Sequence, residues 1–194
     1  MRAVCFVVPS WIGRSAREYL ALHAARGVAA VNPAASKGLD AARGPEPSQI
    51  RELVSMGHRV GAHNDAYRNL RRVTAAEAER EVLEAGDALA AVLGHPARDF
   101  AWAYGRVDSV TPAALALMRE RHGRVYSSVR GLNVAGVTPS VLLRDVASLS
   151  DPRAFRAACI RGAYDHRYVA SRAQLARLAG RLPPPPQASA GRAE

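Results

Sequence analysis

The residue types that could carry chemistry in this sequence follow predicted strands. His63 comes directly after the run Arg59–Ala62, and Tyr67 lies four residues further on. A histidine at such a place is either a buried side chain hydrogen-bonded at a strand end, or a group that binds a metal or moves a proton near neutral pH. The residues alone leave both interpretations of His63 open. The neutral phenol of Tyr67 is a poor zinc ligand.

Aromatic residues and a second histidine accompany two later predicted strands. The run Asp99–Ala103 contains Trp102 and is followed by Tyr104 and Gly105. Aromatic rings here either pack into the core or form a wall on which a sugar stacks. His166 follows the last predicted strand and is a candidate general acid, because the pKa of histidine lies near neutral pH. A surface histidine without a catalytic role is the alternative.

The elements that must position these residues alternate between strands and helices. Short apolar runs predict the strands, and capping boxes, N-terminal prolines and C-terminal glycines delimit the helices. The predicted strands are Val4–Val8, Val28–Val31, Arg59–Ala62, Asp99–Ala103, Val125–Val129, Val141–Val146 and Cys159–Tyr164. The predicted helices are Ala16–Arg26, Ser48–Met56, Ala75–Leu93, Pro112–Gly123, Asp151–Ala158 and Ser171–Leu182. This alternation predicts a mainly parallel α/β sheet or barrel, in which ligands bind at the carboxyl ends of the strands.

Three segments resemble motifs of the polysaccharide deacetylases (carbohydrate esterase family four). Gly57–Leu70 resembles the family pattern G-H-E-[IV]-G-[SCN]-H-[ST]-x-x-H-x-x-L. Arg98–Gly105 resembles R-x-F-[AR]-[YF]-P-[YF]-G, and Ser127–Asn133 resembles S-x-x-R-G-x-N. The resemblance extends from Met1 to about Leu182. It implies a distorted barrel of parallel strands surrounded by helices.

The resemblance also implies a hydrolase that removes acetyl groups from N-acetylated sugars by means of a metal-activated water. In the family, two histidines four residues apart bind a divalent metal, commonly zinc, together with an aspartate from an earlier motif. His63 matches the first of these ligands, and Tyr67 stands in place of the second. Zinc binding by this chain is therefore expected to be weak or lost.

The same resemblance assigns roles to five further residues. Tyr104 and its neighbours Trp102 and Gly105 are expected to line the substrate groove and to hold the oxyanion of the tetrahedral intermediate. Arg144 stands where the family carries an arginine that orients the base carboxylate. His166 is expected to protonate the leaving amine.

The family's first motif, T-F-D-D-G, is expected before Met1 and has no counterpart in this sequence. That motif supplies the catalytic base and a metal-binding aspartate, so the resemblance predicts a barrel that lacks its first strand and helix. Either the natural start lies further upstream, or the chain is a degenerate relative that keeps the scaffold. Tyr67, and Ala103 in place of the family's proline, favour degeneracy. The open sheet edge predicts a covering partner, self-association or poor solubility.

Length and composition predict one domain over residues 1–182 and a disordered, Pro-rich tail over residues 183–194. No apolar run is as long as a transmembrane helix. No small-residue cleavage site follows the short apolar start, so a cytoplasmic chain without a signal peptide is expected. Cys5 and Cys159 lie in apolar stretches and are predicted to be free thiols.

The net charge of +10 raises the question of a nucleic-acid partner. All basic residues except Lys37 are arginines, and they are scattered along the chain. This pattern predicts a solvated basic surface without a specific nucleic-acid partner. Three functions stay open: a metal-dependent deacetylase, a catalytically inactive relative that binds carbohydrate or a protein partner, and a nucleic-acid-binding module that rests on charge alone. In the second, Trp11, Trp102 and Tyr104 would line a groove without chemistry.

Overall fold

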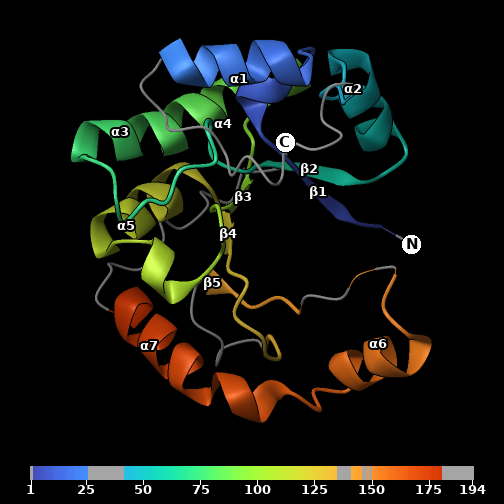
Figure 1. Ribbon diagram of the computed structural model, residues 1–194, viewed down its shortest axis with the longest axis vertical. Coiled ribbons are helices and arrows are strands. Elements are labelled where there is room, and N and C mark those ends of the chain that lie inside the picture. The colour runs from blue at the N-terminus through green and yellow to red at the C-terminus, as the bar shows by residue number, and fades with distance from the viewer. Residues whose placement is uncertain (1, 26–41, 135–140, 146–147, 149, 181–194) are drawn as a thin grey trace, which may run out of the picture.

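The computed structural model describes residues 2–25, 42–134, 141–145, 148 and 150–180. The predicted strand Val28–Val31 and the predicted tail at residues 183–194 lie outside these ranges. Figure 1 shows strands that cross the centre of the molecule, with helices arranged in an arc around them.

Five parallel strands form one sheet whose spatial order is the order of the sequence. The strands are β1 (Val4–Val7), β2 (Arg59–Ala62), β3 (Asp99–Ala101), β4 (Arg124–Tyr126) and β5 (Val141–Leu142). Within the described residues, β1 and β5 are the two edges. Because neighbouring strands run in the same direction, their carboxyl ends all lie on the same side of the sheet, across the ends of the strands. The predicted α/β class with a parallel sheet is confirmed.

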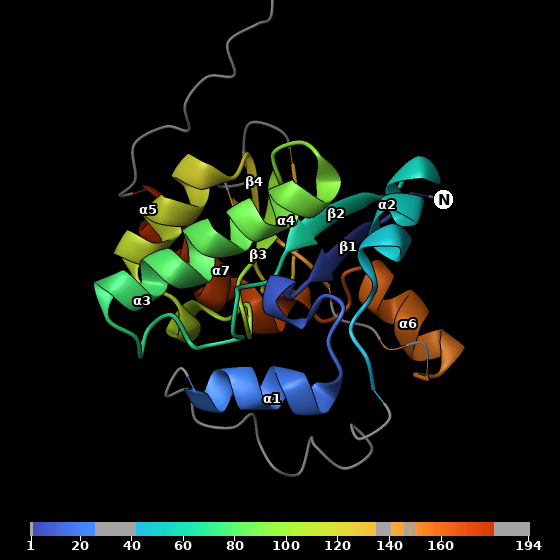
Figure 2. The same cartoon turned by 90° about the horizontal axis from the view of Figure 1, so that it is seen from above.

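The helices are α1 (Ala16–Ala25), α2 (Pro47–Ser55), α3 (Ala75–Glu79), α4 (Ala85–Leu93), α5 (Pro112–Arg121), α6 (Arg153–Ile160) and α7 (Val169–Gly180). Helices α1 to α5 lie between successive strands from β1 to β4, and α6 and α7 follow β5. Short turns of 3-10 helix occur at η1 (Pro9–Trp11), η4 (Val107–Ser109) and η5 (Asp165–Tyr168). Figure 2 shows α1 set apart from the layer that contains α3 and α4.

Local hydrogen bonds explain where several helices begin and end. Ser15 and Glu18 form the predicted capping box, in which the Glu18 carboxylate accepts the Ser15 N–H at 2.8 Å. Thr74 and Glu77 form another, with the Thr74 N–H 2.7 Å from the Glu77 carboxylate. Gly94 ends α4 with a φ of +76°, a left-handed conformation that glycine adopts without strain.

The long helix predicted between Ala75 and Leu93 contains a π-helical turn, η3 (Arg80–Glu84), that joins α3 to α4. Glu81 in this turn is buried and accepts the backbone N–H of Ala66 at 3.1 Å. The turn therefore connects the helix to the loop that follows β2.

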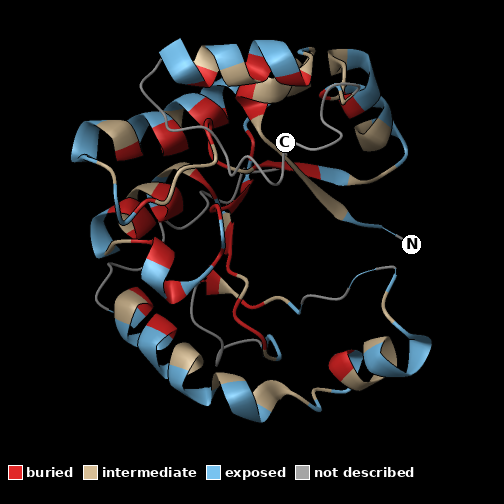
Figure 3. Cartoon of the chain, in the orientation of Figure 1, coloured by how far each residue is buried: buried red, intermediate tan, exposed pale blue. Residues whose placement is uncertain are grey.

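The core lies between the sheet and the helices that pack on it, shown in red in Figure 3. Phe100 of β3, Leu89 of α4, and Leu115 and Met118 of α5 are all completely buried. Burying one such side chain stabilises the fold by about 1.5–3 kcal/mol relative to leaving it exposed. The core fixes β2, β3 and β4, and with them the loops at their carboxyl ends.

One predicted strand is wrong. Cys159–Tyr164 was expected to be a strand, but α6 continues to Ile160 and the chain then turns at residues 161–164. A short apolar run is compatible with either a strand or a helix face, and here Cys159 is the buried residue of an amphipathic helix. Cys5 and Cys159 are both free thiols, as predicted. None of the described helices combines the length and apolarity needed to cross a membrane.

Candidate functional site

His63 lies at the carboxyl end of β2, where its backbone N–H donates to the Val7 carbonyl at 2.8 Å and extends the pairing with β1. Its Nδ1 is 2.6 Å from the Ala101 carbonyl oxygen at the end of β3. Because a carbonyl oxygen accepts, Nδ1 carries the proton and the neutral ring presents its lone pair at Nε2. The His63 ring is thus fixed by two neighbouring strands.

The environment keeps His63 neutral. Burial lowers its pKa and the positive charge of Arg144 lowers it further, although the hydrogen bond to Ala101 acts in the opposite direction. At neutral pH the side chain is therefore an imidazole with a free Nε2, able to accept a proton or to coordinate a cation.

Two tyrosines lie beside His63. The Tyr67 ring contacts the His63 ring edge-on, with centroids 5.1 Å apart, and lies 5.4 Å from the Tyr104 ring. Burial raises the pKa of Tyr67, so its phenol stays neutral. The Tyr104 side chain is 52% exposed and presents its ring to solvent at this edge of the sheet. The three rings form a continuous aromatic surface.

Three residues around His63 have left-handed backbones although they are not glycines. Asn64, Tyr67 and Tyr104 have φ values of +57°, +56° and +65°. Such conformations cost on the order of 1–3 kcal/mol for a residue with a Cβ and tend to concentrate at functional sites. Their clustering beside one histidine marks this loop pair as a candidate site.

Asn64 explains how the two loops are joined. Its side chain is fully buried; Oδ1 accepts the Ala103 N–H at 3.0 Å and Nδ2 donates to the Arg68 carbonyl at 3.0 Å. The Ala103 N–H is therefore occupied, and the Gly105 N–H donates to the Trp102 carbonyl at 3.1 Å. Between them, the Tyr104 N–H donates to no acceptor in the described part of the chain. It is the amide available for a ligand oxygen.

Gly105 packs directly against Ser128, in the segment that follows β4. It has a φ of +63°, and a Cβ here would lie 2.1 Å from Ser128 Oγ and 2.6 Å from the Ser128 backbone nitrogen. The Ser128 N–H donates to the Gly105 carbonyl at 2.8 Å. Glycine is thus required by the contact with Ser128, and this contact holds Tyr104 in place. The predicted role of Gly105 in binding substrate stays a prediction.

Arg144 follows β5 and reaches the same site. The residue before it, Leu143, pairs with both ends of the Asn133 amide at 2.8 and 2.9 Å. The Arg144 Nε donates to the Ser127 carbonyl at 2.7 Å, and its guanidinium lies over the Phe6 ring at 5.1 Å. Burial lowers its pKa, but a guanidinium stays charged in proteins.

No described carboxylate forms an ion pair with Arg144. Burying part of a cation without a carboxylate to pair with it is costly. The Arg144 guanidinium lies over the Phe6 ring, whose centroid is 6.3 Å from that of His63, and its charge lowers the pKa values of both His63 and Tyr67. Arg144 thus lies near His63, and its predicted role in orienting a base stays a prediction.

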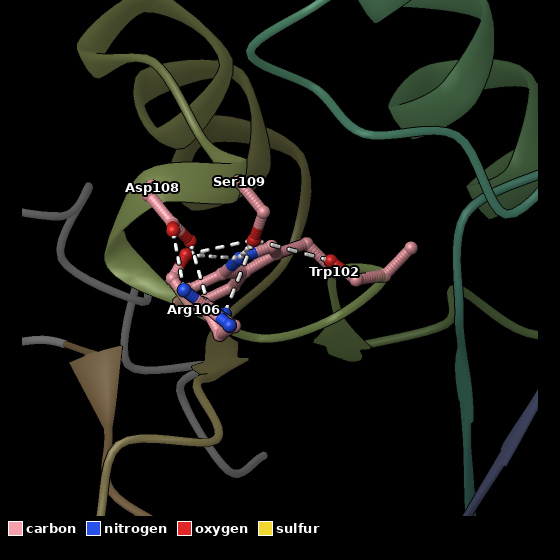
Figure 4. A network of polar contacts seen from close by, with 5 residues as sticks. Trp102, Arg106, Asp108 and Ser109 are labelled. Atoms are coloured by element: carbon pink, nitrogen blue, oxygen red, sulfur yellow. Dashed lines mark hydrogen bonds and ion pairs between the residues drawn. The ribbon is translucent and has the colours of Figure 1, made fainter.

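Trp102 does not form a wall for a sugar. Its side chain is completely buried, and Nε1 donates to Ser109 Oγ at 3.1 Å and to the Arg106 carbonyl at 3.2 Å (Figure 4). The strand ends at Ala101, and the ring turns into the core where its N–H finds acceptors. Trp102 therefore braces the turn that carries Tyr104.

His166 lies in the 3-10 turn η5 between α6 and α7, not after a strand. It is exposed, and within the described residues no contact joins it to His63, Tyr67 or Arg144. Its proposed role as general acid stays a prediction.

The described residues do not fit the family's metal. Among them, no group of three or more His, Cys, Asp and Glu side chains is placed to hold a metal ion. At the site itself, His63 offers one nitrogen, Tyr67 is a neutral phenol, and Arg144 is a cation that repels a metal ion. A zinc ion requires three or four ligands.

Sequence reasoning missed two residues of the site. Phe6 of β1 packs edge-on against Tyr126 at 5.1 Å, lies 6.3 Å from the His63 ring and supports Arg144. The local sequence pattern predicts only a strand residue at Phe6, because the residues that it contacts come from distant segments of the chain. Asn64 carried a usable signal, since asparagine directly after a strand is the type of residue that tolerates a left-handed backbone.

The fold and the site together describe a parallel α/β protein with a candidate ligand site at the carboxyl ends of its strands. The family model for polysaccharide deacetylase matches residues 1–121. The chain therefore belongs to the polysaccharide deacetylase family, as its motifs predicted. A search of curated proteins found no match.

Solved structures share this fold. A polysaccharide deacetylase from Bacillus cereus matches with a TM-score of 0.53 and 18% identity over 62% of this chain and 38% of that protein. IcaB from Ammonifex degensii matches with a TM-score of 0.54 and 17% identity over 92% and 62% of the two chains. A de-N-acetylase from Aggregatibacter actinomycetemcomitans matches with a TM-score of 0.55 and 13% identity over 81% and 64%. The chain thus spans less than two thirds of each of these three proteins, and the likeness is one of fold.

Proposed function

We propose that this chain binds N-acetylated saccharides at the site formed by His63, Tyr67, Tyr104 and Arg144, and does not hydrolyse them by itself. The absence of hydrolysis is proposed because of the donor set: His63 supplies a single nitrogen, and among the described residues no group of three or more His, Cys, Asp and Glu side chains is placed to hold a metal ion. Deacetylation by metal-activated water needs more ligands and a base.

Saccharide binding is supported by family membership and by the chemistry of the surface. The Tyr67 and Tyr104 rings present apolar faces next to hydroxyl groups, a combination that suits a pyranose ring. The free Tyr104 N–H and the His63 Nε2 offer one donor and one acceptor for an acetamido group. The Arg144 guanidinium adds hydrogen-bond donors from the side of β5.

A metal-dependent deacetylase is the second candidate, and one observation favours it. His63 is held by the Ala101 carbonyl in the tautomer that leaves Nε2 free, which is how metal-binding histidines are commonly oriented. Hydrolysis would then require ligands from beyond the described residues. The bound metal, if supplied in that way, would activate water.

Calorimetry with N-acetylchitotetraose tests saccharide binding. Tyr104→Ala should weaken binding at least tenfold, because it removes the exposed ring of the aromatic surface. Tyr164→Ala is the matched control, since Tyr164 packs against Phe155 of α6 outside the site. Equal affinities for the two variants would rule out the proposed site, and no binding by the unmodified chain would rule out the function.

A further inference from the structure

A hollow of about 620 Å³ opens between α1 and the end of β1, next to the candidate site. Aliphatic and aromatic side chains line it, among them Val7, Val8, Trp11, Tyr19 and Leu20. His63 and Tyr67 also line it, so the hollow is continuous with the site. Pockets for small molecules commonly have volumes of about 300–1,000 Å³ and are mostly apolar.

No charged side chain lines the hollow within the part of the chain that the structure describes: none of its lining residues there is Asp, Glu, Lys or Arg. Burial raises the pKa of Tyr19 to about 12 and also raises that of Tyr67, whereas burial lowers the pKa of His63. All three titratable side chains are therefore neutral near pH 7. A space with these walls favours an uncharged, apolar group over water or an ion.

The hollow is far larger than an acetyl group requires. A water molecule takes up about 30 Å³ in the liquid, and an acetyl group is only a few times larger than that. If the acetamido carbonyl of a saccharide lies at His63 and the sugar ring at Tyr104, an acetyl methyl would leave most of the hollow empty. An apolar space that is left empty gains neither dispersion contacts nor burial.

We infer that the hollow binds the acyl chain of N-acyl amino sugars longer than N-acetyl, with the amide at His63 and the sugar at the Tyr67–Tyr104 surface. This inference rests on the proposed saccharide binding and specifies its ligand. Each methylene transferred from water to apolar surroundings contributes about 0.8 kcal/mol, which is about a fourfold gain in affinity. Affinity should therefore rise steadily with chain length.

Calorimetry on the full 194-residue chain measures this with N-acetyl-, N-butanoyl-, N-hexanoyl- and N-octanoylglucosamine. Leu20→Glu places a carboxylate in the hollow and should abolish the gain with chain length. Leu22→Glu is the matched control, because Leu22 is a half-buried leucine of the same helix that does not line the hollow. Circular dichroism of both variants checks the fold. Octanamide, which lacks the sugar, is titrated into the unmodified chain as an independent probe.

The expected result is a rise of about fourfold per methylene in the unmodified chain and in Leu22→Glu, and a flat series in Leu20→Glu. Four equal affinities in the unmodified chain would overturn the acyl pocket and leave saccharide binding intact. Binding of octanamide and the octanoyl sugar without the acetyl sugar would support the hollow and overturn the proposed function. Failure of every ligand to bind would overturn both.

Discussion

Gly105→Ala tests whether the contact between the Tyr104 turn and Ser128, in the segment after β4, holds the site together. An alanine here takes on the left-handed φ of +63° and places its Cβ 2.1 Å from Ser128 Oγ and 2.6 Å from the Ser128 nitrogen. Rotation of the serine side chain cannot relieve the second contact, because that atom belongs to the backbone. The left-handed conformation costs about 1–2 kcal/mol, and overpacking adds about 1–3 kcal/mol.

Gly94→Ala is the control that isolates the free-energy cost of a left-handed backbone from the cost of the steric contact. Gly94 has a similar φ of +76°, but a Cβ there meets nothing within 4 Å. The Gly94→Ala variant should therefore lose about 1–2 kcal/mol of unfolding free energy, whereas Gly105→Ala should lose about 2–5 kcal/mol. In a domain of this size, each 1 kcal/mol lowers the Tm by about 2–4 °C.

Urea unfolding followed by circular dichroism measures the difference between the two alanine variants. Adding Ser128→Gly to Gly105→Ala should restore part of the loss, because it removes the Oγ contact and keeps the backbone contact. Equal unfolding free energies for Gly94→Ala and Gly105→Ala would refute the argument that Ser128 packs against this turn.

Two further predictions concern charges. Arg144→Met should raise the pKa of His63, because the positive charge of Arg144 lowers it in the unmodified chain. NMR titration of the imidazole measures this pKa, and Arg161→Met should leave it unchanged. An unchanged His63 pKa in Arg144→Met would contradict the proximity of the two side chains. Asp99→Asn should cost about 1–3 kcal/mol at pH 7, because the buried carboxylate accepts from Arg124 at 2.7 Å and from Tyr126 at 2.8 Å. Burial alone would raise the pKa of Asp99, but these hydrogen bonds outweigh it and the pKa lies below its usual value. The contribution of Asp99 is then fully present above the unfolded pKa of about 3.9 and is lost as the pH falls through the lower, folded pKa. Urea unfolding measures the difference in unfolding free energy between the unmodified chain and Asp99→Asn at several pH values. This difference should narrow as the pH falls below about 3.9, and a difference that stays constant down to about pH 3 would contradict the account.

The fold was largely predictable from the sequence because local signals agreed with the tertiary structure. The capping boxes at Ser15 and Thr74 fixed two helix starts, and Arg59–Ala62 was predicted with its observed bounds. The π turn at Arg80–Glu84 was not predictable, since it depends on Glu81 reaching the loop after β2. The apolar residues near Cys159 suited a strand or a helix equally, and local pattern could not decide between them.

The grouping of the candidate residues was predictable in part, and their roles stay predictions. The motif resemblance singled out His63, Tyr67, Tyr104 and Arg144, which the structure brings together from three loops. It failed for Trp102, whose direction depends on acceptors supplied by Ser109 and Arg106 further along the chain. A motif gives the order of residue types, whereas the side on which a ring packs depends on long-range contacts.

Zinc calorimetry combined with acetate release from N-acetylchitotetraose tests the central claim most directly. His63→Ala serves as the test variant and His95→Ala as the control, because His95 is exposed after α4 and lies outside the site. The account predicts that the chain binds the saccharide, binds no zinc stoichiometrically, and releases no acetate. One tightly bound zinc per chain, lost in His63→Ala and kept in His95→Ala, together with acetate release, would contradict it.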